Sequence, residues 1–317
     1  MLDGVENVPR IQTKKLSRRE FIKLSGAAGA GFFAWLLGGC KGGVPDQPQS
    51  VPIVKPNAYA TATPVLGDAL DNSKLDAKKP IATTEQVEYL NKNKREPVEM
   101  ILEKLRGQVR VVGLGEMHNE LDMELFASDV VKKATEQKLI QFLALEIDSF
   151  KQSDIDTFLQ TGNITPGLQE ELTRHNTGYK AILEAARSAN LKVLCVDNHN
   201  TSGRDDFMSK SILQFQEANP NSKGLFYAGN GHIIERFDIL AGMLGDKYYS
   251  VLQINEQNIV TGDTVYNALV QSGIQTPVGV DNIPQTPFSK ATYGHPYELW
   301  SEYGKITDAL VLLPPKK

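Results

Sequence analysis

The chain has 317 residues, with 38 acidic and 34 basic side chains and a formal net charge of −4. Residues 1–39 hold six basic and three acidic side chains, so 28 basic and 35 acidic residues remain after them, a net charge of about −7. Contacts from Lys and Arg to phosphates supply most of the affinity for nucleic acid. An acidic chain without basic runs therefore excludes nucleic acid as a partner.

The first forty residues resemble a twin-arginine export signal that ends in a lipoprotein cleavage site. Arg18 and Arg19 stand in the stretch Ser-Arg-Arg-Glu-Phe-Ile-Lys, and a weakly apolar, glycine-rich segment follows. A membrane-spanning helix needs about 20 strongly apolar residues, so this segment indicates a removable signal. It closes on Leu-Gly-Gly-Cys, which resembles a lipobox whose Cys40 thiol takes a diacylglycerol. The alternative is a short buried helix, which leaves the paired arginines unexplained.

Cleavage before Cys40 predicts a protein that is anchored by lipid to a bacterial membrane and works outside the cytoplasm. The partners implied are the twin-arginine translocase, the lipoprotein-processing enzymes and the membrane itself, through the lipid on Cys40. The chain has only two cysteines, so lipidation leaves Cys195 without a disulfide partner. Cys195 lies between Leu194 and Val196, and we expect an inert, buried thiol.

Residues 41–81 are rich in Pro, Ala, Thr, Ser, Asp and Asn and have no periodic apolar pattern. Such a segment buries too little apolar surface to fold alone, so we predict a disordered tether. Residues 82–317 then form a single domain of ordinary size.

Short apolar runs alternate with helical patterns along this domain. A capping-box-like opening at Thr83 begins the first helix, and Pro97 separates it from a second. We predict strands over 109–114, 140–146, 192–196, 224–228, 248–254 and 309–313, and helices over 120–137, 179–189 and 205–218. This alternation predicts an α/β fold, a three-layer αβα sandwich with a mainly parallel central sheet.

Polar residues follow four of the predicted strands directly, and open parallel sheets bind ligands at the carboxyl ends of their strands. The first strand runs into Gly-Glu-Met-His, with Glu116 and His118, and the second ends in Leu-Glu at Glu146. A helix beginning near Arg204 follows the third strand. The fourth ends in Gly-Asn-Gly-His at His232, on a loop whose glycines let the backbone turn sharply. We expect these five side chains to converge on one crevice.

Each of these residues also has an ordinary structural explanation. Glu116 and His118 could cap the following helix, and His232 could bond a neighbouring loop. Glu146 could accept local backbone N–H groups, and Arg204 could pair with the surface acids Asp205 or Asp206. Further polar residues near strand or helix ends lack a firm motif. They are Asp148, Asp197, His199, His175 and His295. Surface or packing roles are favoured for the last two, His175 and His295.

Four motifs in this order resemble the superfamily of erythromycin esterases, ChaN-like haem-binding lipoproteins and TIKI/TraB metalloproteases. They are Gly-Glu-x-His, Leu-Glu, the Arg-Asp-x-x-Met of Arg204–Met208, and Gly-x-Gly-His. The resemblance covers about residues 109–254 and a final strand over 306–312. The lipoprotein signal is similar to that of the ChaN-like branch, and Arg-Asp-x-x-Met is similar to the esterase branch. The haem-binding branch places an aromatic ligand before a helix, which implies Tyr179 beside His175.

These residue types permit hydrolysis by an activated water, with or without a metal. Glu116, His118, Glu146 and His232 form a mixed set that suits Mn²⁺, Co²⁺, Zn²⁺ or Fe²⁺. Without a metal, His118 or His232 would take a proton from water, Glu116 or Glu146 would orient the ring, and Arg204 would stabilise the oxyanion. The sequence leaves both routes open.

Three functions from different classes follow. The first is a hydrolase of an ester, amide or peptide bond, with a small-molecule or peptide substrate. The second is a haem- or iron-binding lipoprotein of the ChaN-like type, and the third is a non-catalytic surface module on the same fold. The expected convergence of polar residues favours the hydrolase.

Overall fold

The computed structural model describes residues 82–175, 177–201, 203–234, 239–256, 264–295 and 298–315. The predictions on the export signal with Arg18 and Arg19, on Cys40 and on the tether concern residues outside this part of the chain, so they stay predictions. Among the described helices, none is both long and apolar enough to cross a membrane.

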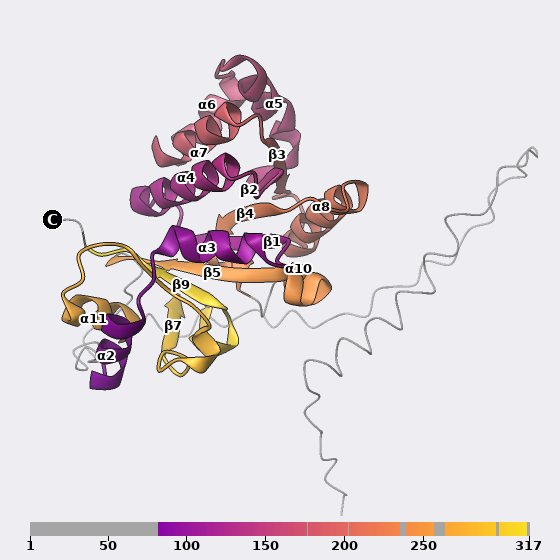
Figure 1. The fold of residues 1–317 in the computed structure, drawn as a ribbon. Helices are drawn as coiled ribbons and strands as arrows, with labels where there is room; N and C mark the ends of the chain where they lie inside the picture. Colours follow the sequence, from indigo (N-terminus) through magenta and orange to yellow (C-terminus); the bar gives the residue numbers. More distant parts are fainter. Residues whose placement is uncertain are drawn as a thin grey trace, which may run out of the picture. The chain divides into compact units, whose positions relative to one another are not determined.

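A seven-stranded sheet in the order β3-β2-β4-β1-β5-β9-β6 forms the centre of the domain (Figure 1). Its strands are β1 (Val111–Glu116), β2 (Phe142–Asp148), β3 (Lys192–Asp197), β4 (Gly224–Gly229), β5 (Tyr248–Ile254), β6 (Val278–Val280) and β9 (Ala309–Leu312). Neighbouring strands are parallel, except that β6 is antiparallel to β9. The strands β7 (Thr292–His295) and β8 (Glu298–Glu302) form a separate antiparallel pair.

The described helices include the three that the sequence predicted between the first four strands. In chain order they are α2 (Thr84–Asn93), α3 (Pro97–Arg106), α4 (Leu121–Glu136), α5 (Gln152–Thr161), α6 (Pro166–Thr173), α7 (Thr177–Ser188), α8 (Arg204–Ala218), α9 (Asn230–Ile233), α10 (Ile239–Leu244) and α11 (Thr264–Ser272). Thr83 and Gln86 form the capping box that begins α2, and Pro97 is the first residue of α3. Both local predictions are confirmed.

Alternate residues of the central strands enter two separate hydrophobic cores, one on each face of the sheet. Leu143 and Leu145 of β2 pack in a core with α3, α4, α5 and α7. Phe142 and Ala144 of the same strand pack in a second core with α8, α10 and α11. Helices therefore cover both faces of the sheet, as Figure 1 shows for α4 and α7 on one side and α8 on the other. The predicted three-layer fold with a mainly parallel sheet is confirmed.

The carboxyl ends of the central strands lie level with one another. Glu116 of β1 is in register with Gly229 of β4, and Asp148 of β2 with Asp197 of β3. From these neighbouring ends, β1 continues into α4 on one face of the sheet, whereas β4 continues into α9 and α10 on the other. Open α/β sheets bind ligands where neighbouring strands lead to opposite faces. The topology therefore points to the ends of β1 and β4.

Candidate functional site

Glu116 is the last residue of β1, two residues beyond the predicted end of that strand, and its side chain is only 2% exposed. Its Oε2 accepts a hydrogen bond of 2.6 Å from the Tyr227 hydroxyl, and its Oε1 lies 2.8 Å from Nδ1 of His118. Burial, and then the Glu116 charge, raise the pKa of Tyr227 well above its usual range, so the hydroxyl stays a donor. The His118 ring is half-exposed, and its hydrogen bond with Glu116 raises its pKa. Glu116 therefore holds one side of an accessible imidazole.

Glu146 of β2 connects the rest of the site. Its Oε1 accepts a hydrogen bond of 2.8 Å from Nη2 of Arg204 and lies 3.2 Å from Nε2 of His232. Its Oε2 accepts the Gly229 N–H at 2.7 Å and lies 3.9 Å from Nε2 of His118. Burial by itself would raise the pKa of Glu146, but the His232 hydrogen bond and the charges of both histidines lower it to about 2. Glu146 is therefore an ionised carboxylate that contacts Arg204 and both histidines.

His232 lies between two carboxylates. Its Nδ1 is 2.5 Å from Oδ1 of Asp205, and its Nε2 is 3.2 Å from Oε1 of Glu146. Burial lowers the pKa of His232, but these two hydrogen bonds raise it to about 10. An imidazole that stays protonated at neutral pH cannot take a proton from water. His232 therefore supplies positive charge, which leaves His118 as the histidine able to activate a water.

Arg204, the first residue of α8, is fixed by Asp197 at the end of β3. Nε of Arg204 donates to Oδ1 of Asp197 at 2.9 Å, and Nη2 donates to Oδ2 at 2.5 Å. Asp197 is fully buried, and its hydrogen bonds raise the pKa of Arg204. The surface acids considered from the sequence are not the partners of Arg204, since Asp205 contacts His232 instead. Arg204 is therefore held by two carboxylates, with its guanidinium at the strand ends.

The glycine that ends β4 serves close approach and not the sharp turn that we expected. Gly229 has φ of −53° and ψ of 145°, values open to any residue, and the next residues form the helical turn α9, so His232 lies on a helix and not on a loop. A Cβ atom on Gly229 would lie 3.3 Å from Nε2 of His118 and 3.4 Å from Oε2 of Glu146. Contacts that short force a neighbour to move. The bare backbone of Gly229 therefore lets β4 approach both groups.

A second group of ligand-type side chains lies at the ends of β2 and β3. Ligand atoms of Asp148, Asp197 and His199 are within 4.8 Å of one another. The backbone N–H of His199 donates to Oδ1 of Asp148 at 3.0 Å, and its ring Nδ1 lies 3.1 Å from Oδ2 of Asp197. The structure thus brings together three residues that had no motif, and Asp197 links them to Arg204.

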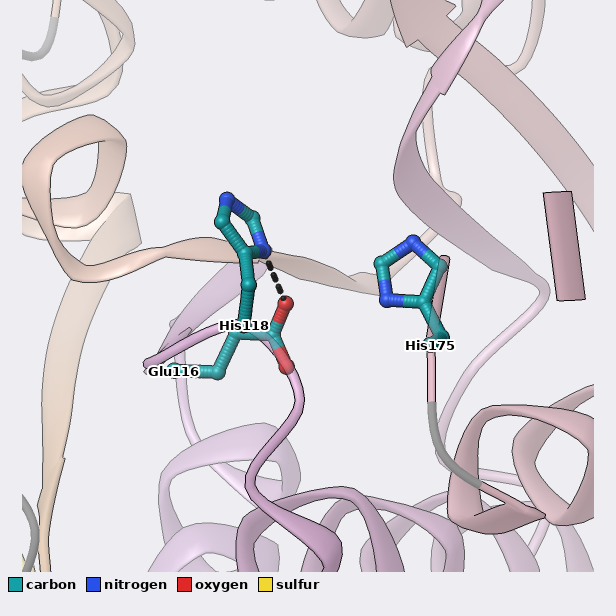
Figure 2. Close-up of side chains that lie close together, drawn as sticks. All are labelled: Glu116, His118 and His175. Carbon is teal, nitrogen blue, oxygen red and sulfur yellow. Dashed lines mark hydrogen bonds and ion pairs between the residues drawn. The ribbon is translucent and has the colours of Figure 1, made fainter. Parts of the chain in front are cut away.

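His175 lies across from Glu116 and His118, although the sequence favoured a surface or packing role (Figure 2). Its ring stacks on Tyr179 with centroids 4.0 Å apart, and the His118 ring is 6.1 Å away, edge-on. Ligand atoms of Glu116, His118 and His175 are within 4.8 Å of one another. In the described part of the chain, Glu146 and His232 do not join this cluster. The predicted four-residue metal set is therefore not the set that the structure brings closest together.

Three further residues lie away from the accessible part of the site. Tyr179 of α7 is 1% exposed and its hydroxyl makes no hydrogen bond; burial raises its pKa well above the usual range. Cys195 is buried, and burial raises the pKa of its thiol to about 12, as an inert thiol requires. His295 belongs to β7, outside the seven-stranded sheet.

Two side chains of the site were missed from the sequence. Asp205 belongs to the Arg-Asp-x-x-Met motif in the first turn of α8, but from the sequence we considered it only as a surface partner of Arg204. Tyr227 lies in the apolar strand β4 and resembles a core residue, with only its place near the strand end as a signal. Each holds a histidine of the site, Asp205 by direct contact and Tyr227 through Glu116.

Comparison with known proteins establishes a shared fold. No family model and no curated protein matches the sequence. A succinoglycan biosynthesis protein superimposes with a TM-score of 0.56 and 11% identity, over 72% of this chain and 96% of its own. A variant of the erythromycin esterase EreC in its open conformation gives 0.54 and 10%, over 74% and 97%. A protein from Bacillus cereus gives 0.52 and 13%, over 74% and 98%.

These identities support a common fold and nothing finer. The erythromycin-esterase-like fold implied by the four motifs is therefore confirmed as a fold. The haem-binding ChaN of Campylobacter jejuni gives a TM-score of 0.32 at 17% identity, over 49% of this chain and 85% of its own. That similarity is too low to support an argument.

Proposed function

We propose that this protein is a hydrolase that cleaves an ester, amide or peptide bond with an activated water. The observation that carries the proposal is the position of His118, a half-exposed imidazole between the buried carboxylates of Glu116 and Glu146. Two cations, Arg204 and His232, contact Glu146 from its other side. An accessible imidazole, buried carboxylates beside it and fixed positive charge are the groups that water activation and oxyanion stabilisation require.

The chemistry follows from how these groups are held. Water, activated at His118, would attack a carbonyl carbon while the C=O electron pair moves to the oxygen. His232 and Arg204 carry the balancing charge, and Asp205 and Asp197 fix them in place before the reaction. Positive charge held in advance costs little reorganisation when the oxyanion forms. His118 takes the proton of the attacking water, and collapse of the tetrahedral intermediate expels the alcohol or amine, which receives that proton from His118.

Haem does not fit the residue that the resemblance assigns to it. An iron-binding phenolate must reach the haem and lose its proton. Tyr179 of α7 is buried, and this burial raises the pKa of its hydroxyl well above the usual range. The structure therefore favours hydrolysis over haem binding.

A panel of chromogenic esters and small peptides tests the proposal, using the chain exported by its own signal, with and without added Mn²⁺, Co²⁺ or Zn²⁺. We expect turnover of at least one panel member that is lost in His118→Ala. Turnover by no member, or a Soret absorption band in the purified protein, would contradict the proposal.

We also propose that the protein is anchored by lipid outside the cytoplasm, from the motif at Arg18 and Arg19 and the lipobox at Cys40. Replacing both arginines with lysine should leave unprocessed precursor in the cytoplasm, because the translocase reads the arginine pair. Cys40→Ala should abolish lipid labelling and leave the folding of the domain unchanged. Fractionation with lipid labelling measures both, and normal export and labelling of the variants would refute the signal.

A further inference from the structure

The proposed hydrolysis gives no role to His175, although its ring faces Glu116 and His118 (Figure 2). Its side chain is only 9% exposed, and its Nδ1 is buried without a hydrogen bond. Oε1 of Glu124 lies 3.8 Å from that nitrogen, beyond hydrogen-bond length. Buried polar atoms are almost always paired. An unpaired imidazole nitrogen aimed at a carboxylate and a second imidazole therefore needs an explanation.

The remaining atoms of the three side chains are positioned as metal ligands usually are. The second oxygen of Glu116 accepts the Tyr227 hydroxyl at 2.6 Å. Nε2 of His118 lies 3.9 Å from Glu146, and Nε2 of His175 lies 3.6 Å from Glu171. Metal-binding histidines characteristically direct their second nitrogen to a carboxylate, and metal-binding carboxylates are themselves hydrogen-bonded. Glu116 makes such a hydrogen bond, and Nε2 of each histidine faces a carboxylate at a distance longer than a hydrogen bond.

Charge also favours a cation at this position. Glu116, Glu124 and Glu171 are buried carboxylates around His175. Burying carboxylates is costly unless positive charge or hydrogen bonds compensate them. Lys151 and Arg174 approach Glu171 at 3.7 and 3.9 Å, and Glu124 accepts the Tyr179 N–H at 3.1 Å. A divalent cation between Glu116 and the two histidines would add positive charge where the carboxylates converge.

We propose that Glu116, His118 and His175 bind one divalent transition-metal cation such as Zn²⁺ or Co²⁺. Two imidazoles and one carboxylate are an established ligand set for such cations, with positions left open for water or substrate. The cation would replace the proton shared by Glu116 and His118. A bound cation lowers the pKa of a water and polarises a carbonyl. Only this catalytic role rests on the proposed function, because binding itself is a property of the three side chains.

The second cluster, Asp148 with Asp197 and His199, is a weaker metal site. Both oxygens of Asp197 accept hydrogen bonds from Arg204, and Oδ1 of Asp148 accepts the backbone N–H of His199. These bonds come from the Arg204 side chain and from backbone, whereas Oε1 of Glu116 is bonded to His118, which is itself one of the proposed ligands. His199 supplies a matched control, since it is a histidine in the competing cluster.

Calorimetric titration of the full exported chain, freed of metal by chelation, with Co²⁺ and Zn²⁺ tests the proposal. We expect one equivalent of cation to bind the wild type and His199→Ala alike. Tyr227→Phe should weaken binding about 10- to 100-fold, the usual effect of losing a residue that orients a ligand. His175→Ala and Glu116→Gln should weaken it at least as much. Circular dichroism shows whether each variant is folded, and the Co²⁺ absorption bands should change in His175→Ala.

Unchanged affinity in folded His175→Ala, or no binding by the wild type, would overturn the metal site. Equal loss in His199→Ala would instead place the cation at the second cluster. A second measurement, the unfolding temperature, covers variants that fold poorly. Zn²⁺ at a subsaturating concentration should raise the unfolding temperature of the wild type, because a ligand that binds the native state stabilises it. The same concentration should not raise the unfolding temperature of Tyr227→Phe. Hydrolysis without metal binding refutes the metal site alone, whereas metal binding without any hydrolysis refutes the proposed function alone.

Discussion

Replacing Glu146 with Gln should lower the free energy of unfolding by roughly 3 kcal/mol near pH 5–6. Glu146 is buried, and its pKa in the folded protein is about 2 against an ordinary value of 4.5. A difference of this size between folded and unfolded states corresponds to about 3 kcal/mol, at about 1.4 kcal/mol for each pH unit. The loss arises because Arg204 and His232 would keep their charges beside a neutral amide.

The pH dependence of this loss has a definite sign. The folded pKa of Glu146 is lowered, so its stabilisation is fully present above about pH 4.5 and disappears as the pH falls toward 2. The pKa of His232 is raised to about 10, so its share is complete below about pH 6.5 and fades as the pH rises toward 10. The difference between wild type and variant should therefore be largest between these limits.

Urea denaturation followed by circular dichroism, from pH 2.5 to 8, measures this difference. Glu170→Gln is the control, because Glu170 is an exposed carboxylate that pairs with the exposed Arg174, and its other partner, the buried Lys151, keeps a second carboxylate in Glu171. Exposed ion pairs contribute about 0–1 kcal/mol, so that variant should change little at any pH. A Glu146→Gln effect as small as that of Glu170→Gln, or one independent of pH, would show that Glu146 does not hold the site together.

Alanine substitutions of His118 and His232 should each remove most of the hydrolytic rate without adding to one another. The His118→Ala variant lacks the imidazole that activates water, which should lower the rate about 10²- to 10⁴-fold. The His232→Ala variant lacks a cation. It also removes one of the two rings that approach Glu146. Residues that act in one step are strongly non-additive, so the double variant should be hardly slower than His118→Ala.

Values of kcat/KM for the two single variants and the double variant on one substrate measure this coupling. His199→Ala is the control imidazole, since its ring contacts Asp148 and Asp197 and not Glu146, and it should keep most of the activity. Circular dichroism of each variant excludes unfolding as the cause. If the losses simply multiply, or if both single variants remain fully active, the two histidines do not serve one water.

The sequence predicted the fold well because its local signals agree with one another. Apolar runs of strand length predicted the central strands. The Thr83 capping box and Pro97 predicted where α2 and α3 begin. The strand ends were less predictable. Glu116 can continue β1 because Tyr227 and His118 hydrogen-bond its buried carboxylate. The spacing of residues in the sequence does not reveal these two contacts. The short strands β6, β7 and β8 carry too few residues to show a period.

The site was predicted where a motif lay at a strand end and was missed where tertiary packing decided. Glu146 and Arg204 meet because β2 and β3 end level with one another, which follows from a parallel sheet. His175 comes from the connection between α6 and α7, and the packing of α7 against α4 brings it to Glu116. The role of Gly229 was misjudged because a turn and a close approach both favour glycine.

The central claim is that a water activated at His118 attacks the substrate directly. Mass spectrometry of the acid released in ¹⁸O-labelled water, in a single turnover with enzyme in excess, tests this claim on whichever panel member is cleaved. Direct attack predicts one ¹⁸O atom in the acid from the first turnover, and product formation slowed about 10²- to 10⁴-fold in His118→Ala. Unlabelled acid would show instead that a carboxylate such as Glu146 attacks first and passes its own oxygen to the product, and the account would then be wrong.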